Sequence, residues 1–168
     1  MDSEHDTPEE VYQFAGELLF ITQSFEDIVG ATIKLVYSDL SEFDIEAFYR
    51  HDKKTLGMLL RDLRKQVEIE DDFDDWLKEL LQERNFFAHQ ISREPWFDPD
   101  APEGRKQIWE FYSRYYQRLE TAMMTFGNIL FNFAKETGVE IPGDRYKDKA
   151  ISDLQSYSDL AAKIKTKG

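Results

Sequence analysis

Arg84, Asn85 and His89 are the side chains of this sequence whose types and spacing could do chemistry. On a helix, which turns by about 100° per residue, Arg84 falls in the middle of an apolar face centred on Leu77. Asn85 and His89 fall one turn apart at the flank of that face. A guanidinium group removed from water costs several kcal/mol unless an anion or a hydrogen-bond partner compensates it. These residues therefore predict a polar site at the edge of a buried helix face, where a guanidinium can bind an anion and an imidazole can transfer a proton.

Arg84 also has a purely structural interpretation. A carboxylate on a neighbouring helix would neutralise the buried guanidinium group, and the first predicted helix offers Glu26 and Asp27. That helix must pack on the helix with Arg84 if both are to bury their apolar faces. The sequence leaves two interpretations open: a catalytic site supported by these carboxylates, and a structural ion pair.

The composition limits the classes of function. The 168 residues suffice for one domain. The 34 acidic and 21 basic residues give a net charge of -13, which excludes a broad basic surface for nucleic acid or anionic lipid. Cysteine is absent and the three histidines lie far apart, so we expect no metal site, and no glycine-rich loop predicts a cofactor. The acidic N-terminus and the lack of a long apolar run predict a cytoplasmic protein without a membrane span.

The first predicted helix begins at Pro8, because Thr7 and Glu10 can form a capping box around this start. Apolar residues at steps of three and four continue the helix over 8–37. Residues 38–53 show no sustained period, and their conformation stays open.

The rest of the chain predicts further helices and no strand. The expected elements are a second helix over 56–67, a third over 73–91 that stops before Pro95, a fourth from Pro102 to a stop at Gly138, and a weaker terminal helix over 151–164. We therefore predict an all-α fold, an antiparallel up-and-down bundle of four main helices with a short C-terminal helix. We expect three parts of the chain: a flexible acidic N-terminus over 1–7, the helical bundle over 8–136, and a turn and helix over 137–168 that pack on the bundle or stay partly mobile.

The segment Glu83–His89, ERNFFAH, resembles the signature of the HEPN superfamily. That signature has an arginine, then a polar residue that is usually Asn, Asp or His, and a histidine about five positions after the arginine. The segment also lies late in the third long helix, where the superfamily places it, and Lys54–Leu59 resembles the second helix of HEPN-like proteins. The resemblance covers roughly residues 8–136, and it implies a metal-independent endoribonuclease in which two chains dimerise and bring their motifs together at one cleft.

The resemblance also implies a role for each residue of the motif. His89 would take the proton of a 2′-hydroxyl group or give one to the leaving oxygen. Arg84 would hold the scissile phosphate, and Asn85 would orient the phosphate or His89. Attack by the 2′-oxygen needs no metal and leaves a 2′,3′-cyclic phosphate. Because Arg84 and His89 differ by about 140° around a helix, two symmetric copies could surround one substrate, which favours a homodimer through this face.

Basic residues that follow the motif are candidates for RNA contacts. They are Arg93, Arg105, Lys106 and Arg114. Trp96, Phe97 and Trp109 lie among them and would offer stacking surfaces in a local groove. The alternative is that the arginines form a solvated face and the aromatic residues belong to the core. Residues 1–33 contain eight acidic and no Lys or Arg side chains, so any contact with RNA must be local.

Two other classes of protein stay open. Some HEPN relatives have lost catalysis and serve as binding or assembly domains, and some pair with an antitoxin. The chain could therefore be a toxin-like or defence-related nuclease, or a non-catalytic module that binds a protein partner or a nucleotide. An acidic antitoxin or nucleic-acid mimic would instead bind a basic protein through its negative charge, without dependence on His89.

Overall fold

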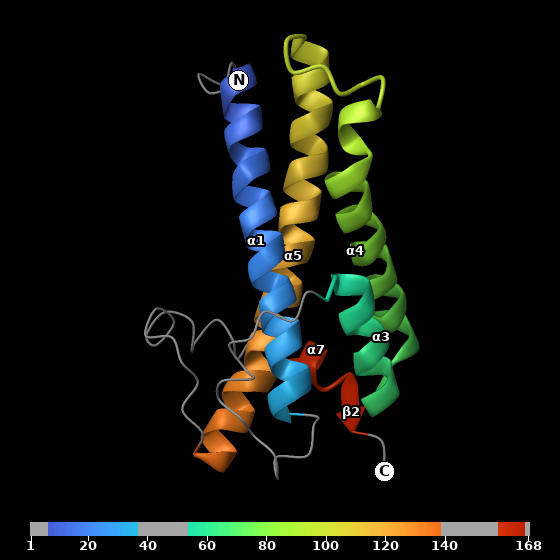
Figure 1. The fold of residues 1–168 in the computed structure, drawn as a ribbon, viewed down its shortest axis with the longest axis vertical. Helices are drawn as coiled ribbons and strands as arrows, with labels where there is room; N and C mark the ends of the chain where they lie inside the picture. Colours follow the sequence, from blue (N-terminus) through green and yellow to red (C-terminus); the bar gives the residue numbers. More distant parts are fainter. Residues whose placement is uncertain (1–6, 37–53, 139–157, 167–168) are drawn as a thin grey trace.

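The structure is a computed structural model that describes residues 7–36, 54–138 and 158–166 (Figure 1). The predictions for 1–6, 37–53 and 139–157 lie outside these residues. The long elements are the helices α1 (Pro8–Val36), α3 (Leu56–Gln66), α4 (Asp71–His89) and α5 (Pro102–Thr137). The short elements are β1 (Val67–Ile69), the 3-10 helix η2 (Ile91–Arg93), α7 (Ser158–Ala161) and β2 (Ile164–Thr166). The described part of the chain is therefore mostly helical, as predicted.

The ends of the long helices follow local sequence signals. At the start of α1, the Thr7 backbone N–H donates to Glu10 Oε2 at 2.9 Å, and the Glu10 N–H donates to Thr7 Oγ1 at 3.3 Å. This is the predicted capping box. α5 begins at Pro102, and it ends before Gly138, whose φ of 71° is a left-handed conformation that glycine adopts without strain.

The four main helices do not alternate in direction, so the predicted up-and-down arrangement is wrong. The ring of Phe14 lies 5.9 Å from that of Tyr112. Phe25, further along α1, lies 5.9 Å from Phe126, so α1 and α5 run in the same direction (Figure 1). α3 also runs in the direction of α1, because its first residue, Leu56, contacts Glu26, and Leu59 lies against Gly30 one turn further along α1.

A small sheet adds to the helices, which corrects the prediction of a fold without strands. β1 pairs with β2 in an antiparallel register, with Val67 opposite Thr166 and Ile69 opposite Ile164. The predicted second helix thus ends at Gln66 rather than at Val67. Of the predicted terminal helix, residues 158–161 form α7, residues 164–166 form β2 instead, and residues 151–157 lie outside the described residues. The strand pairing joins segments almost a hundred residues apart, and three residues per strand are too few to produce a period-2 signal.

The core lies where α5 packs between α1 and α4. α5 buries residues toward both neighbours, and its fully buried large side chains include Tyr112, Tyr115 and Phe126. Ile108, Phe111 and Leu119 of α5 are buried as well. A helix with two packed neighbours buries more than one stripe of its surface.

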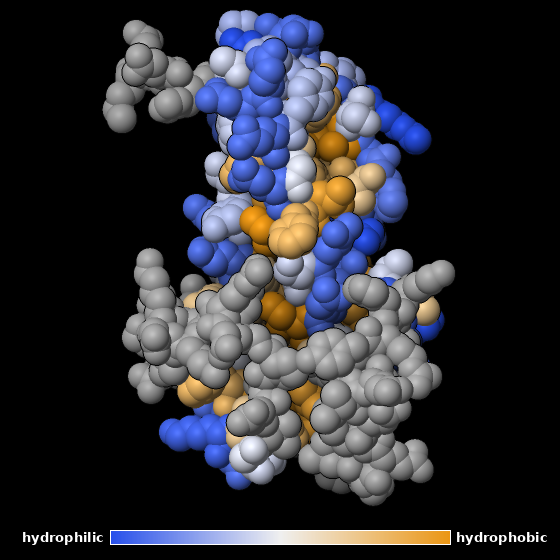
Figure 2. Space-filling view, turned by 60° about the vertical axis from the view of Figure 1, so that its left-hand side comes forward, coloured by the Kyte–Doolittle hydropathy of each residue, from blue (hydrophilic) through white to orange (hydrophobic). Residues whose placement is uncertain are grey.

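Large apolar side chains also reach the surface, chiefly on α1. The exposed residues are Tyr12, Leu19 and Phe20 on α1 and Met58 on α3, at 60%, 46%, 71% and 40% of their full exposure. In the space-filling view, apolar side chains appear in the middle of the molecule, below a hydrophilic region at the end where α1 begins (Figure 2). The described residues contain no helix with the length and apolar character of a membrane span.

The start of α5 requires glycine at position 104, because the neighbouring backbone leaves no space for a side chain. A Cβ atom at Gly104 would lie 2.2 Å from the backbone oxygen of Asp98. We expect Gly104→Ala to lower the free energy of unfolding by roughly 1–3 kcal/mol, because the helix start must move away from the 98–101 turn. Gly16→Ala is the matched control, since its Cβ would meet no atom within 4 Å. Thermal unfolding of both variants measures this, and equal melting temperatures would contradict it.

Candidate functional site

Arg84 of α4 forms an ion pair with Glu26 of α1. Its Nε donates to Glu26 Oε1 at 3.0 Å, and its Nη2 lies 2.9 Å from the same oxygen. Both side chains are largely buried, with exposures of 16% and 17%. The predicted position of Arg84 within an apolar face is therefore confirmed, and so is the pairing with Glu26.

Glu26 also holds the start of α3. The backbone N–H of Leu56, the first residue of α3, donates to Glu26 Oε1 at 3.2 Å. The free N–H groups of a helix start attract a negative charge, so this contact stabilises α3 as well as Arg84. One turn later, a Cβ atom on Gly30 would lie 3.8 Å from Leu59, which places α3 directly against this side of α1. A single carboxylate thus joins α1, α3 and α4.

A buried hydrogen bond lies close to this ion pair. Thr22 Oγ1 and the hydroxyl oxygen of Tyr115 are 2.9 Å apart, and Thr22 Oγ1 also donates to the Leu18 carbonyl at 2.7 Å. Burial raises the pKa of Tyr115 to about 12, against the lowering effects of the Thr22 hydrogen bond and the charge of Arg84. Tyr115 is therefore a neutral, fixed neighbour of the ion pair.

Thr22 and Tyr115 were not among the predicted site residues. Tyr115 follows Tyr112 by three residues and precedes Leu119 by four, so its spacing was compatible with a buried face. Its partner Thr22 is 93 residues away in the chain, and no local pattern could have indicated that pair.

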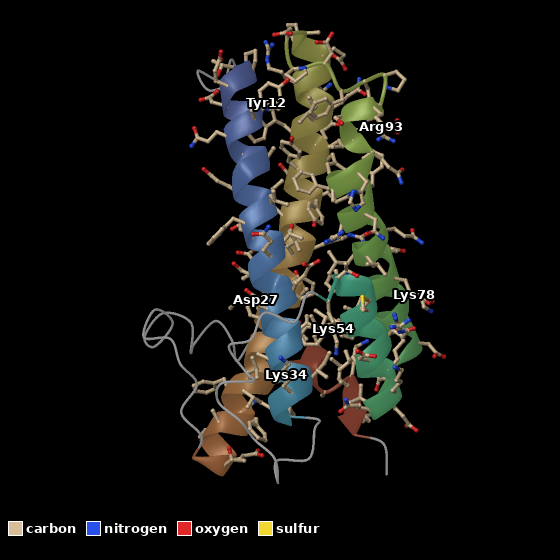
Figure 3. All side chains as sticks on the ribbon, in the orientation of Figure 1. Tyr12, Asp27, Lys34, Lys54, Lys78 and Arg93 are labelled. Carbon is tan, nitrogen blue, oxygen red and sulfur yellow. The ribbon has the colours of Figure 1, made fainter. Side chains whose placement is uncertain are left out.

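Asn85 and His89 are both exposed, one turn apart on α4. Asn85 Oδ1 accepts a long hydrogen bond of 3.4 Å from Arg84 Nη1, so this edge of the guanidinium group is directed toward the exposed pair. Asp27 of α1, labelled in Figure 3, is exposed. Arg84 donates to Glu26 and to Asn85. The structure thus brings Glu26, but not Asp27, to Arg84.

Two of the four candidate RNA-binding residues make structural contacts within the protein. Arg105 donates through Nη1 to the backbone oxygens of Pro99 and Asp100, at 2.9 and 3.0 Å, and so fixes the turn before α5. Arg114 donates to Glu83 Oε1 at 2.9 Å, and its guanidinium carbon lies 5.5 Å from the ring centre of Phe111. Arg93 and Lys106 are exposed. Two of the four cations therefore have structural partners.

A groove lies between α4 and α5 on the side of Arg114. Its volume is about 400 Å³. Its lining residues are Gln82, Glu83 and Phe86 of α4, Trp96 of the loop, and Gln107, Glu110, Phe111 and Arg114 of α5. Of the predicted stacking residues, Trp96 lines this groove, whereas Trp109 packs 5.1 Å from Phe14 and Phe97 lies 6.5 Å from Trp96.

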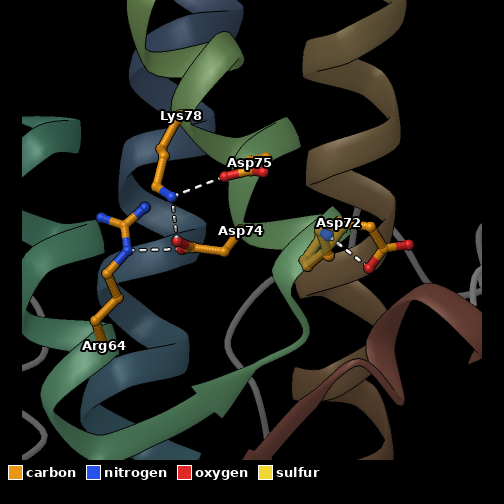
Figure 4. A network of polar contacts seen from close by, with 6 residues as sticks. Arg64, Asp72, Asp74, Asp75 and Lys78 are labelled. Atoms are coloured by element: carbon orange, nitrogen blue, oxygen red, sulfur yellow. Dashed lines mark hydrogen bonds and ion pairs between the residues drawn. The ribbon is translucent and has the colours of Figure 1, made fainter.

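A separate charged network joins α3 to the start of α4 (Figure 4). Asp74 Oδ1 accepts from Arg64 Nε at 2.7 Å, and Asp74 Oδ2 lies 3.0 Å from Lys78 Nζ, which also contacts Asp75 at 2.8 Å. Burial alone would raise the pKa of Asp74, but the hydrogen bonds from Lys78 and Arg64 outweigh it, and the pKa lies below its ordinary value. Each of these charged groups is paired with another side chain of the network, so we assign the network a structural role.

The C-terminal segment is attached to the same end of α4. The ammonium group of Lys163 binds the Asp72 carboxylate, and Lys165 Nζ lies 3.2 Å from Glu70 Oε1. These contacts and the β1–β2 pairing hold the segment against the bundle. Within the described residues, no group of three or more His, Asp or Glu side chains could hold a metal ion.

Comparisons of the chain with protein-family models, with curated proteins and with solved structures found no match.

We expect Glu26→Ala to lower the free energy of unfolding by about 3 kcal/mol, because it leaves Arg84 buried without a counter-charge and the start of α3 without an acceptor. The neighbouring, exposed Asp27 provides the matched control, and Asp27→Ala should change stability by no more than about 0.5 kcal/mol. Urea unfolding followed by circular dichroism measures both. Similar losses in the two variants would show that the ion pair contributes little.

Proposed function

We propose that this protein is a HEPN-like, metal-independent endoribonuclease of toxin-like or defence-related type that acts as a homodimer. The observation that carries the proposal is the arrangement of Arg84, Asn85 and His89. The ion pair with Glu26 holds the side chain of Arg84, and Arg84 Nη1 donates to Asn85. Asn85 and His89 lie exposed one turn apart on the same helix. A fixed cation beside an exposed amide and imidazole is the set that phosphodiester cleavage requires.

The proposed reaction uses the 2′-hydroxyl group of the RNA as the nucleophile. His89 removes the proton of that hydroxyl group, the 2′-oxygen attacks the adjacent phosphorus, and the bond to the 5′-oxygen breaks. A second imidazole, from the partner copy, gives a proton to the leaving 5′-oxygen. Arg84 binds the phosphate as negative charge grows in the transition state, and Asn85 orients it. The products are a 2′,3′-cyclic phosphate and a 5′-hydroxyl end.

An uncovered face of α1 supports dimerisation. Tyr12 and Leu19 precede Glu26 by fourteen and seven residues, so all three lie on one side of the helix. Glu26 is covered by α3, which begins beside it at Leu56. Tyr12 and Leu19 lie beyond that start and are exposed by 60% and 46%. Neither side chain is charged, so this face adds no charge of its own to the repulsion between two chains with a net charge of -13.

The assignment of catalysis predicts a specific result for His89→Ala. We expect purified wild-type protein to cleave RNA in EDTA and to leave cyclic phosphate ends, and His89→Ala to reduce cleavage at least about a hundredfold. Because His89 is exposed, the melting temperature should stay unchanged. Gln90→Ala, which changes the neighbouring exposed residue, is the control and should keep full activity. A mixed RNA pool with added tRNA serves as substrate, and cleavage by His89→Ala at the wild-type rate would contradict the mechanism.

The dimer predicts different results for two neighbouring residues of α1. We expect Leu19→Glu to convert a dimer to a monomer, because it places a charge in the interface. Phe20→Glu is the matched control, since Phe20 is more exposed, at 71%, but lies about 100° further around the helix. Light scattering during size-exclusion chromatography reports the mass. A monomeric wild type, or a dimer that survives Leu19→Glu, would contradict this interface.

One observation favours a second candidate function, a non-catalytic interaction module. The guanidinium group of Arg84 already has a buried carboxylate partner, and this partner also holds α3. In this alternative the polar cluster stabilises the bundle, and the motif faces a protein partner. The His89→Ala experiment separates the two, because an interaction module leaves RNA intact with or without His89.

A further inference from the structure

The α4–α5 groove has the shape and the walls of a site for a small planar ligand. Its volume of about 400 Å³ is within the range of small-molecule sites, and it is open to solvent on one side. None of Arg84, Asn85 and His89 lines it. The groove is therefore a feature separate from the motif, although both lie on α4.

Three aromatic rings form one side of the groove. Phe86 lies 6.2 Å from Trp96 with the two rings inclined by 23°, and it meets Phe111 edge-on at 5.3 Å. Trp96 lies 6.5 Å from Phe111, so the three rings are in mutual contact. Phe86 and Trp96 are only partly buried. Exposed ring surface of this kind binds flat, aromatic ligands by stacking.

The polar lining selects among flat ligands. Gln82 and Gln107 each offer an amide donor and an amide acceptor, and Glu83 and Glu110 offer carboxylate acceptors. The single cation, Arg114, is already paired with Glu83 at 2.9 Å. Because Glu83 and Arg114 neutralise each other, Glu110 leaves the lining with one net negative charge, which disfavours a phosphate group, whereas a neutral ring with an amino group would meet acceptors. The lining therefore fits a nucleobase and disfavours the phosphate next to it.

The groove also lies next to His89 along α4. Gln82, Phe86 and His89 stand at positions i, i+4 and i+7, which share one face of a helix. A base held against Phe86 is thus one helical turn from the imidazole group. This neighbourhood links the groove to the reaction at His89.

We propose that the α4–α5 groove binds one unpaired nucleobase with an exocyclic amino group, stacked on Trp96 and Phe86 and hydrogen-bonded by Gln82 and Gln107. The role of this base as part of an RNA substrate rests on the proposed ribonuclease function. The binding of the base itself does not. The groove would then set the preference of the enzyme for adenine or cytosine over uracil beside the cleaved bond.

The test measures binding without cleavage, on the full chain. Adenosine, cytidine and uridine are titrated by calorimetry against wild type, Gln107→Ala, Trp96→Ala and Gln117→Ala. Gln117 is the matched control, because it is an exposed glutamine on α5 outside the groove. We expect adenosine and cytidine to bind more tightly than uridine. Gln107→Ala and Trp96→Ala should each weaken adenosine binding about fivefold or more, and Gln117→Ala should leave it unchanged.

Three results would overturn the proposal: no saturable binding of adenosine or cytidine at millimolar concentration, uridine binding as tight as adenosine binding, or a loss in Gln117→Ala equal to that in Gln107→Ala. If Trp96→Ala melts early, Gln107→Ala alone decides, since it changes a partly exposed position of α5 to a good helix former.

Two further measurements separate this proposal from the ribonuclease itself. His89→Ala should bind adenosine as the wild type does, so that loss of cleavage with retained binding leaves the groove assignment in place. A 2′-O-methyl RNA hexamer of adenosines, which cannot be cleaved, should compete with adenosine if the natural ligand is RNA. Adenosine binding without such competition would assign the groove to a free nucleoside instead, and cleavage without adenosine binding would overturn the groove assignment alone.

Discussion

The ion pair between Arg84 and Glu26 is the interaction on which the rest of the site depends. One oxygen of Glu26 accepts from two nitrogens of Arg84 and from the first backbone N–H of α3. Removing a carboxylate from water costs several kcal/mol, and the three donors to Glu26 offset this cost. The same contact fixes the side-chain conformation of Arg84 and the position along α1 at which α3 begins. The geometry of the motif and the packing of α3 are therefore set by one residue of α1.

The position of α3 has a consequence for the surface of the molecule. α3 has 11 residues against 29 in α1 and 36 in α5, so it covers only part of the side that α1 and α4 share. The part of α1 before Glu26, which α3 does not cover, keeps Tyr12 and Leu19 exposed. The short length of α3 thus leaves an apolar part of α1 uncovered.

The charge of the chain restricts where a polyanion can bind. Three of the six acidic side chains of α4 are paired with cations of α3 and α5: Asp74 with Arg64, Glu79 with Arg118, and Glu83 with Arg114. One of these arginines, Arg114, was a candidate for RNA contact. The α4–α5 groove is lined by aromatic rings, amides, two carboxylates and the single cation Arg114, and is no basic patch. Recognition by stacking and amide hydrogen bonds is consistent with an acidic protein, because neither depends on a positive surface.

The sequence determined the features that arise from local physics. The capping box of Thr7 and Glu10, the stop at Gly138 and the buried position of Arg84 all follow from spacing and backbone preference, and the structure has each of them. The tertiary structure decided the rest. Helical periodicity carries no information on direction, so the parallel run of α1 and α5 could not be predicted. Nor could the pairing of Thr22 with Tyr115, the β1–β2 sheet, or the choice of Glu26 over Asp27, because each depends on which surfaces meet across long stretches of chain.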